Sequence, residues 1–313
     1  MIRMPPLVSA FDDNYVWPWI VHFYSGWASQ GRCERLLGVA PGALSAESRK
    51  AIDSVSEWLG NPVKWVSIGL PQDLPVSSYI TPLAYARLAL ADVLESRFIW
   101  LDADTLLSSG WQEILELPPL PSGVVARACP EHPEFLQAST RNQARIRAGT
   151  MYFNSGVMEI DPNLWRKHGF DREWPLLVQQ YDEHHFEYLD QDILNFLLTK
   201  KTTMLPDQFN FKRPFASHVS IEPRILHYSG ELKPWKIKGT QRTRLFCATS
   251  STPFYWYKKF WLLEKRLLSE ALQHSAGLHE QLEAIRVRAQ RTGEGTPDRI
   301  KRKLKSMLHV SND

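Results

Sequence analysis

Short apolar runs alternate with longer amphipathic segments along the first hundred residues of this 313-residue chain. The apolar runs predict four strands, over residues 7–15, 35–40, 63–69 and 98–101, of which the first ends in a polar turn. A helix is predicted over 45–59, with Ser45 as a cap, and the Ala, Leu and Arg content of residues 83–94 predicts another. This alternation indicates an α/β fold: a mostly parallel central sheet with helices on both faces and a site at the carboxyl ends of its strands.

Two aspartates directly follow the last of these strands. In "FIWLDADT" (98–105), Asp102 and Asp104 end a buried strand as a pair of like charges, which is costly to desolvate unless a cation lies between them. Because side chains two apart on an extended segment point the same way, both carboxylates can face one ion while Ala103 points elsewhere. Hard oxygen ligands suit magnesium or manganese, so the pair is a candidate metal site.

Two other interpretations fit the aspartate pair. The first is a pair of solvated carboxylates at a strand end, without any ligand. The second is the start of a phosphatase of the haloacid dehalogenase type, in which the first Asp would be the nucleophile and the second a general acid. That family places the motif near its own N-terminus and needs a later "GDxxxD" arrangement, which the chain lacks downstream.

The composition is that of an ordinary folded protein. Apolar residues make up 43% of the chain and charged residues 23%, which excludes the disordered and fibrous classes. The longest apolar stretches, such as "WPWIVHFY" (17–24), are much shorter than the roughly 20 residues that span a bilayer, and the N-terminus has no signal-peptide pattern. Three cysteines without a CxxC pair indicate neither a disulfide framework nor a zinc site. We therefore expect a cytoplasmic protein.

The positive charge is concentrated towards the C-terminus. Residues 258–313 hold 12 lysines and arginines against 7 aspartates and glutamates, a balance of +5, whereas residues 1–257 hold 25 against 27. Residues 254–272 mix aromatic and basic side chains in a way that suits a lipid headgroup interface, and residues 299–305 hold five cations. The tail is predicted to contact an anionic membrane or, as the alternative, to pack its aromatic residues on the rest of the protein with its basic end solvated.

Further polar motifs follow one another along the chain. They are "FDDNYV" (11–16), "YFNSGVMEID" (152–161), "LDQDILN" (189–195) and "LHYSGELKPW" (226–235), with "FNF" (209–211) between the last two. Each motif alone is weak, but all of them in this order are hard to obtain by chance. Over residues 7–240 the chain thereby resembles the retaining glycosyltransferases of family 8, in particular the bacterial galactosyl- and glucosyltransferases of lipooligosaccharide and lipopolysaccharide synthesis.

The resemblance implies a GT-A nucleotide-diphospho-sugar transferase fold, a UDP-sugar donor and a manganese cofactor, with magnesium as the alternative. We expect a catalytic domain over residues 1–253 and a mainly helical C-terminal extension over residues 254–313. The expected reaction moves a hexose to a glycan or lipid-linked acceptor, in the cytoplasm or at the inner face of the membrane, with no nucleic-acid partner. The non-enzymatic alternative is a carbohydrate-binding protein that keeps the fold without turnover.

The resemblance also assigns roles to individual residues. It implies that the metal ligands are Asp102, Asp104 and His227. It implies that the nucleotide-sugar contacts are Asp12, Asn14, Tyr15, Arg87, Asp102, Ala103, Asn154, Asp190, His227, Gly230 and Lys233. Tyr15 offers a ring for stacking, Lys233 a point charge for a diphosphate, and a histidine ligand favours manganese over magnesium. Structural alternatives remain open: an Asx turn in "DDNY", a helix-surface arginine at position 87 and a structural histidine at position 227.

Asp190 and Gln191 are the expected catalytic residues, because the resemblance places them nearest the anomeric carbon. A covalent intermediate needs a carboxylate nucleophile, a part that an amide such as Gln191 serves poorly, so front-face attack within an ion pair is favoured. "DQDILN" also fits the capped start of an apolar helix, and both interpretations can hold. Residues 128–156 contain the segment that in this family covers the donor and helps to form the acceptor site, but they match nothing that identifies the acceptor.

Overall fold

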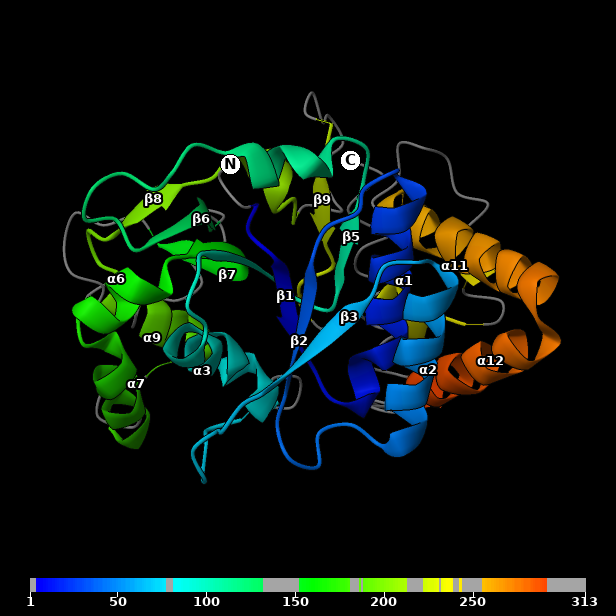
Figure 1. The fold of residues 1–313 in the computed structure, drawn as a ribbon, viewed down its shortest axis with the longest axis horizontal. Helices are drawn as coiled ribbons and strands as arrows, with labels where there is room; N and C mark the ends of the chain where they lie inside the picture. The colour runs from blue at the N-terminus through cyan, green and yellow to red at the C-terminus, as the bar shows by residue number, and fades with distance from the viewer. Residues whose placement is uncertain are drawn as a thin grey trace, which may run out of the picture.

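A seven-stranded sheet forms the centre of the computed structural model, which describes residues 4–76, 81–131, 152–180, 186, 188–212, 222–230, 232–238, 242–243 and 255–291. In spatial order the strands are β3 (Val63–Ser67), β2 (Arg35–Val39), β1 (Leu7–Ala10), β4 (Phe98–Leu101), β7 (Phe153–Ile160), β6 (Ala126–Pro130) and β8 (Thr202–Met204) (Figure 1). Neighbouring strands are parallel except that β7 runs antiparallel to both β4 and β6. The predicted mostly parallel α/β sheet is confirmed.

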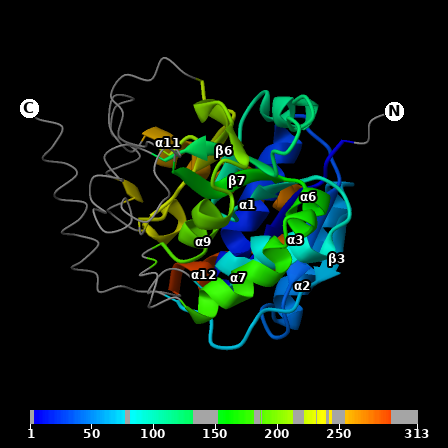
Figure 2. The ribbon, with the colours of Figure 1, turned by 90° about the vertical axis from the view of Figure 1, so that its left-hand side faces the viewer.

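Helices cover both faces of this sheet, and each face buries its own apolar cluster. One face carries α1 (Val16–Ala28), α2 (Ala46–Trp58), α11 (Tyr255–His274) and α12 (Ala276–Arg291). The other face, towards the viewer in Figure 2, carries α3 (Ala86–Val93), α6 (Pro162–Lys167), α7 (Phe170–Gln179) and α9 (Asp190–Leu197). Short 3-10 turns are η1 (Asp13–Tyr15), η2 (Pro82–Tyr85), η3 (Trp111–Glu116), η4 (Asp207–Phe209) and η5 (Pro234–Lys236).

Strand β4 explains why "FIWL" is apolar at every position. Phe98 and Trp100 belong to the cluster under α3, whereas Ile99 and Leu101 belong to a third cluster on the opposite face. Because β4 lies between β1 and β7, both of its faces are covered and neither tolerates a polar side chain. The strand is therefore apolar up to its carboxyl end, where the chain continues into Asp102.

A second, two-stranded sheet brings the distant polar motifs together. It pairs β5 (Thr105–Leu107) with β9 (Ile225–His227) in antiparallel register, with Thr105 opposite His227. The turn that holds Asp102 and Asp104 connects β4 to β5, so this pairing places His227 beside both aspartates. The motif at residues 226–235 thus reaches the site through one short ladder.

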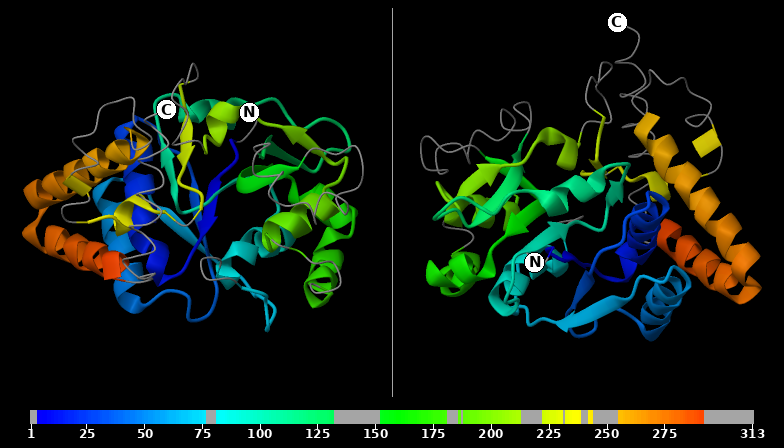
Figure 3. Two further views of the ribbon diagram at one scale, coloured as in Figure 1. Left: turned by 180° about the vertical axis from the view of Figure 1, so that it is seen from behind. Right: turned by 45° about the horizontal axis from the view of Figure 1, so that its top comes forward.

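The two C-terminal helices pack against the rest of the chain, including α1 and η5, instead of standing free (Figure 3). Tyr257, Phe260, Trp261 and Leu267 of α11 are at most 3% exposed and share one cluster with α1, α2 and η5. The prediction that these side chains face lipid is wrong, because their apolar surface is already buried in the core; the packing alternative holds for them. Residues 299–305 lie outside the described residues.

Within the described part of the chain, no helix combines the length and the apolar character needed to cross a bilayer.

Asp92 makes the stability of this fold sensitive to pH. Its carboxylate accepts the indole N–H groups of Trp165, at 2.8 Å, and Trp174, at 2.9 Å, and so ties α3 to α6 and α7. Burial raises the pKa of Asp92 to about 6, although the two indole bonds oppose the shift. The carboxyl group of Asp92 binds its proton more tightly in the folded state than in the unfolded state, where its pKa is near 4. The free energy of unfolding therefore falls as the pH rises from about 4 through the folded-state pKa.

We expect the free energy of unfolding of the wild type to fall by about 1–2 kcal/mol relative to Asp92→Asn between pH 4 and pH 7, a range that allows for partial solvent screening. Urea unfolding of both proteins at several pH values measures this difference. Parallel pH profiles for the two proteins would show that Asp92 ionises without penalty.

Candidate active site

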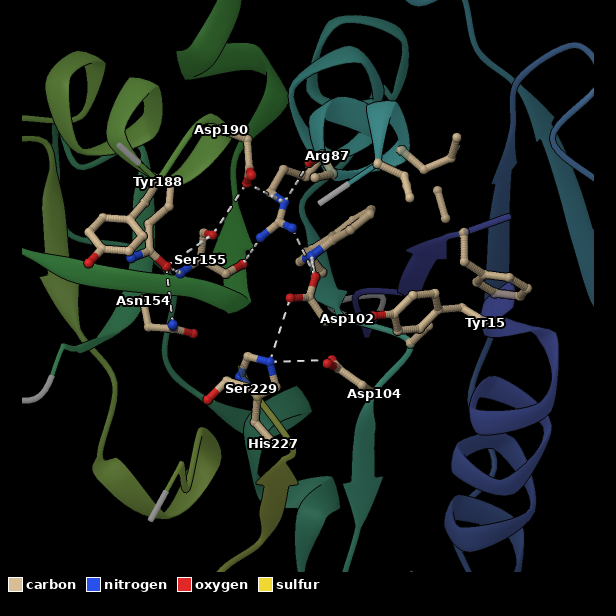
Figure 4. A pocket seen from close by; sticks show the side chains of 18 of the residues that line it. Tyr15, Arg87, Asp102, Asp104, Asn154, Ser155, Tyr188, Asp190, His227 and Ser229 are labelled. Carbon is tan, nitrogen blue, oxygen red and sulfur yellow. Dashed lines mark hydrogen bonds and ion pairs between the residues drawn. The ribbon is translucent and has the colours of Figure 1, made fainter. Parts of the chain in front are cut away.

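The carboxyl ends of β1 and β4 and the start of β7 meet at a cavity of about 330 Å³, a size that suits a small-molecule ligand (Figure 4). All but one of the predicted site residues line it, together with Ala10, Phe11, Thr81, Leu83, Ala84, Trp100, Glu131, Ser155, Tyr188 and Ser229. The exception is Asn14, which is exposed and whose backbone N–H is bonded by the Asp12 carboxylate at 2.9 Å. The fold therefore gathers motifs from along the whole chain into one place.

Asp102 and Asp104 lie in a turn, which corrects the prediction of an extended segment. The backbone N–H of Thr105 donates to the Asp102 carbonyl at 3.2 Å and closes the turn. Both carboxylates nevertheless reach towards His227, whose Nε2 lies 3.7 Å from Asp102 Oδ2 and 3.3 Å from Asp104 Oδ1 (Figure 4). The two carboxylates therefore face the same point, as predicted, but because of the turn and not because they alternate along a strand.

A chain of hydrogen bonds between buried polar side chains supports this turn. Arg35 Nη1 can only donate, so its 3.1 Å contact makes His22 Nε2 an acceptor and leaves the proton on Nδ1. His22 Nδ1 then donates to Thr105 Oγ1 at 3.0 Å, and this hydroxyl donates to the Asp102 carbonyl at 2.8 Å. Complete burial, reinforced by Arg35, lowers the pKa of His22 well below its usual value. A neutral, fixed imidazole therefore holds the main chain of the aspartate turn.

Cations of the protein itself compensate both carboxylates, so a metal is not their only partner. Arg87 Nη2 lies 3.0 Å from Asp102 Oδ1, and Lys233 Nζ lies 2.5 Å from Asp104 Oδ2. Arg87 is only 4% exposed, so the interpretation as a helix-surface arginine is wrong. Burial raises the pKa of Asp102 despite Arg87, whereas Lys233 and His227 outweigh the effect of burial and hold the pKa of Asp104 well below its usual value.

Gly156 lets His227 pack against β7. A Cβ atom at this position would lie 2.2 Å from His227 Cε1 and 3.0 Å from Asp102 Oδ2. The same residue accepts the backbone N–H of Asp102 at 2.8 Å. The glycine of "FNSG" is thus required by the close approach of the histidine and the aspartate turn.

An unusual backbone conformation precedes the candidate catalytic pair. Leu189 has φ +50° and ψ −115°, a strained combination for a residue with a side chain, and α9 begins immediately after it, at Asp190. Asp190 Oδ2 lies 3.3 Å from Arg87 Nε, and burial raises the pKa of Asp190 to about 6 against the pull of Arg87. Gln191 Oε1 accepts the backbone N–H of Ser155 at 3.1 Å. The predicted helix start is confirmed but the predicted cap is not, because the residue at the cap position is Leu189, which makes no side-chain cap hydrogen bond. Both Asp190 and Gln191 also line the cavity.

The opposite wall of the cavity is aromatic and basic. Asp12 makes the Asx turn that was left open as an alternative, yet it also lines the cavity, and burial raises its pKa. The Tyr15 ring contacts Trp235 edge-on, with ring centres 5.8 Å apart, and Lys233 Nζ lies 6.0 Å from the centre of the same ring. Gly230 has φ +84°, a conformation that favours glycine. This wall offers an aromatic face beside a positive charge.

Sequence reasoning missed several residues of the site. Asn210 is part of the motif "FNF" but was assigned no role, and its Oδ1 lies 2.9 Å from His227 Nδ1. Ser155 lies inside "FNSG", and Glu131 falls in the segment 128–156 that matched nothing. The signal for Asn210 was its place between two motifs, whereas no spacing pointed to Glu131. Within the segment tied to the acceptor, residues 132–151 lie outside the described residues.

The chemistry of Asp102, Asp104 and His227 fits a divalent metal. One ligand atom from each lies within 4.8 Å of the other two, and no other cluster of three or more potential ligands occurs in the described residues. Two carboxylate oxygens and one imidazole nitrogen suit manganese, while magnesium prefers an all-oxygen set. The structure therefore brings together the predicted metal ligands.

A mostly parallel sheet with an Asp-x-Asp turn at its edge and a histidine beside it is the arrangement of the GT-A fold. The chain belongs to glycosyl transferase family 8, whose model matches residues 6–239. It is similar to general stress protein A of Bacillus subtilis, with 24% identity over 73% of this chain and 86% of that protein. It is also similar to the lipopolysaccharide 1,3-galactosyltransferase of Salmonella typhimurium, with 25% identity over 52% of each.

The same fold occurs in the crystal structure of the galactosyltransferase LgtC in complex with donor and acceptor sugar analogs. The two structures superpose with a TM-score of 0.63 at 23% identity, over 82% of this chain and 94% of LgtC. The aligned region spans about half the length of the Salmonella enzyme. The predicted family and fold are thus confirmed, and the chain is a glycosyltransferase.

Proposed function

We propose that the protein is a metal-dependent retaining hexosyltransferase that moves a hexose from a UDP-sugar to a glycan or lipid-linked acceptor. The observation that carries this proposal is the convergence, in one cavity, of a three-ligand metal site with Arg87, Lys233, Asp190 and Gln191. The Salmonella relative and LgtC are both galactosyltransferases, which supports a donor that carries a hexose.

The wall formed by Asp12, Tyr15 and Lys233 suits the nucleotide. A carboxylate accepts N–H and hydroxyl donors of a base or ribose, and the Tyr15 ring offers a stacking surface. Asn14 reaches the nucleotide only if its exposed side chain turns towards it. Lys233 is held between Asp104 and the Tyr228 carbonyl, at 2.5 Å and 2.8 Å, within the same cavity. Its point charge would serve a diphosphate bound beside Gly230.

Asp102, Asp104 and His227 would hold manganese, with magnesium as the alternative. When bound, the metal supplies positive charge that stabilises the diphosphate as a leaving group. Arg87 contributes positive charge from the side of α3 and orients Asp190. These residues would hold the donor at its diphosphate, and Asp190 and Gln191 at the start of α9 would contact the sugar.

Front-face displacement fits the contacts of Gln191 better than a covalent route through this residue. Its Oε1 accepts from the Ser155 N–H and from Asn154 Nδ2, both at 3.1 Å, and its Nε2 lies 3.1 Å from the Tyr152 hydroxyl. An amide held in this way orients a sugar but is a poor nucleophile. The acceptor hydroxyl would attack on the face that the UDP leaves, and its proton would pass to a diphosphate oxygen.

Neither alternative gains support from the site. A haloacid dehalogenase-like phosphatase would use Asp102 as a nucleophile, but Arg87 and Trp100 both bind Asp102 Oδ1, at 3.0 Å and 2.7 Å. A non-catalytic carbohydrate-binding protein would have no need of a strained Leu189 ahead of Asp190. The second alternative predicts binding without turnover, which the following assay detects.

The test is to incubate the protein with manganese and a panel of nucleotide sugars, and to measure UDP release with and without simple glycan acceptors. We expect release from a UDP-hexose that chelation of the metal abolishes. Asp53→Asn, on the solvent side of α2, is a matched carboxylate control that should keep full activity. Tight binding of a UDP-sugar with no release in the presence of any acceptor would indicate a binding protein.

We further expect the product to keep the anomeric configuration of the donor. The physical reason is that attack and departure take place on the same face of the sugar. Proton NMR of the product reports the configuration through the anomeric coupling. A β-linked product from an α-linked donor would show that the enzyme inverts, and some group near Gln191 would then have to act as a base.

We also propose a cytoplasmic location with peripheral membrane contact through Arg299, Lys301, Arg302, Lys303 and Lys305. An anionic leaflet attracts such residues by about 1 kcal/mol each near its surface. Truncation after Gly295 should reduce sedimentation with anionic liposomes at low salt and leave UDP release in solution unchanged. Full-length protein that ignores these liposomes would indicate that the basic tail serves another partner.

A further inference from the structure

Two buried amides, those of Asn210 and Asn154, join His227 to Gln191. Asn210 Oδ1 lies 2.9 Å from His227 Nδ1, and Asn210 Nδ2 donates to Asn154 Oδ1 at 2.9 Å. Asn154 Nδ2 in turn donates to Gln191 Oε1 at 3.1 Å. All four residues are at most 8% exposed, so water does not compete for these bonds. The metal side and the sugar side of the cavity are thus joined by a continuous set of hydrogen bonds.

Backbone N–H groups fix the direction of this chain. The N–H of Gly156 donates to Asn154 Oδ1 at 3.0 Å, and the N–H of Ser155 donates to Gln191 Oε1 at 3.1 Å. A backbone N–H can only donate, so neither amide can be turned over without placing two donors against each other. Asn154 must therefore present its oxygen to Asn210, and Asn210 must present its NH2 group to Asn154.

The orientation of Asn210 determines the tautomer of His227. Because Asn210 uses its NH2 group on Asn154, its oxygen faces His227 Nδ1, and this nitrogen must carry a proton to form the 2.9 Å bond. In the neutral ring, Nε2 then keeps its lone pair, and it is Nε2 that lies nearest Asp102 and Asp104. The ring is held in the one neutral form that can bind a cation between itself and the carboxylates.

We propose that Asn210 is a positioning residue that fixes the tautomer and ring orientation of His227 and couples the metal site to Asn154 and Gln191. Partners of this kind around a ligating histidine typically change metal affinity by about 10–100-fold when removed. The effect on turnover rests on the proposed transferase function, whereas the tautomer itself does not.

The tautomer is tested without metal or substrate. Protein with nitrogen-15 labelled histidine is examined by NMR at alkaline pH, and the His227 signals are assigned by their loss in His227→Ala. We expect the proton on Nδ1 in the wild type and a shift towards the Nε2–H form, which free imidazole prefers in water, in Asn210→Leu. A wild-type ring that carries its proton on Nε2 would overturn the proposal, whatever the reaction of the enzyme.

Metal affinity is tested by a double-mutant cycle. Binding of manganese in the presence of UDP is followed by the loss of the paramagnetic signal of the free ion. We expect about a 10–100-fold weaker affinity in Asn210→Leu than in the wild type, and no further loss when Asn210→Leu is added to His227→Ala. An undiminished affinity in Asn210→Leu, or losses that add in the double variant, would show that Asn210 does not act through His227.

Asn210→Asp separates the two connections of the amide. Its carboxylate still accepts from His227 Nδ1 but cannot donate to Asn154 Oδ1, so we expect near wild-type manganese affinity with reduced turnover. Asn61→Leu, at a buried amide outside the cavity, controls for general effects of removing an amide, and thermal unfolding checks that each variant is folded. Turnover that follows metal affinity in every variant would exclude coupling to the sugar side.

Discussion

Asp104→Asn should abolish manganese-dependent binding of UDP and lower transfer by about two to three orders of magnitude, because a charged metal ligand worth several kcal/mol is lost. Asparagine is the informative substitution. Its side-chain oxygen can still accept from Lys233, whereas alanine would leave that lysine buried without its 2.5 Å partner and would also destabilise the fold. Asp102→Asn should behave similarly, since it keeps an acceptor for Arg87.

Calorimetric titration with UDP, with and without manganese, measures the effect. His227→Ala should weaken manganese binding less than either aspartate change, since one neutral ligand is lost and no charge. Equal affinity for UDP in the presence and absence of manganese in the wild type would refute the metal assignment. Thermal unfolding of each variant separates loss of the site from loss of the fold.

Trp261→Ala should destabilise the protein by about 3–5 kcal/mol and also weaken UDP binding. The indole is 1% exposed, and its Nε1 donates to the Pro234 carbonyl at 2.9 Å, directly beside Lys233. The Tyr257 hydroxyl donates to the Leu232 carbonyl at 2.7 Å on the same loop. Helix α11 therefore holds the main chain on both sides of the lysine that is proposed to meet the diphosphate.

Urea unfolding and UDP titration measure the two effects of Trp261→Ala. Leu262→Ala is the matched control on the same helix: Leu262 is 52% exposed, so its removal should change the unfolding free energy by no more than about 0.5 kcal/mol. If Trp261→Ala lowered stability but left the affinity for UDP unchanged, α11 would support the fold without positioning the loop.

Strands β1 to β4 were predictable because buried strands leave a strong apolar signal, whereas β6, β7 and β8 of the same sheet were not predicted. The run 98–101 is apolar at every position, since it is covered on both faces, and its end marks the edge of the sheet where Asp102 lies. The grouping of the two aspartates with His227 was predicted from the family resemblance, which rests on the order of the motifs. No periodicity could show that β5 and β9 form the ladder that brings them together, since each strand has only three residues.

Other features depend on contacts that no local pattern records. The partners of Arg87 and Lys233 are 15 and 129 residues away in the chain, so their ion pairs with the aspartates could not be read from spacing. The aromatic residues of α11 have the composition of a membrane-interface segment, and only the cluster that buries them distinguishes the two cases. The direction of the amides around Asn210 likewise requires coordinates.

The antiparallel course of β7 has a consequence for changes that the fold tolerates between β6 and β7. Because β6 ends and β7 begins at the same rim of the sheet, the Glu131 N–H reaches the Tyr152 carbonyl at 2.9 Å, across the two ends of the connection 132–151. This hydrogen bond holds the residues on either side of the connection together. A replacement between residues 131 and 152 therefore need not shift the register of β6 and β7.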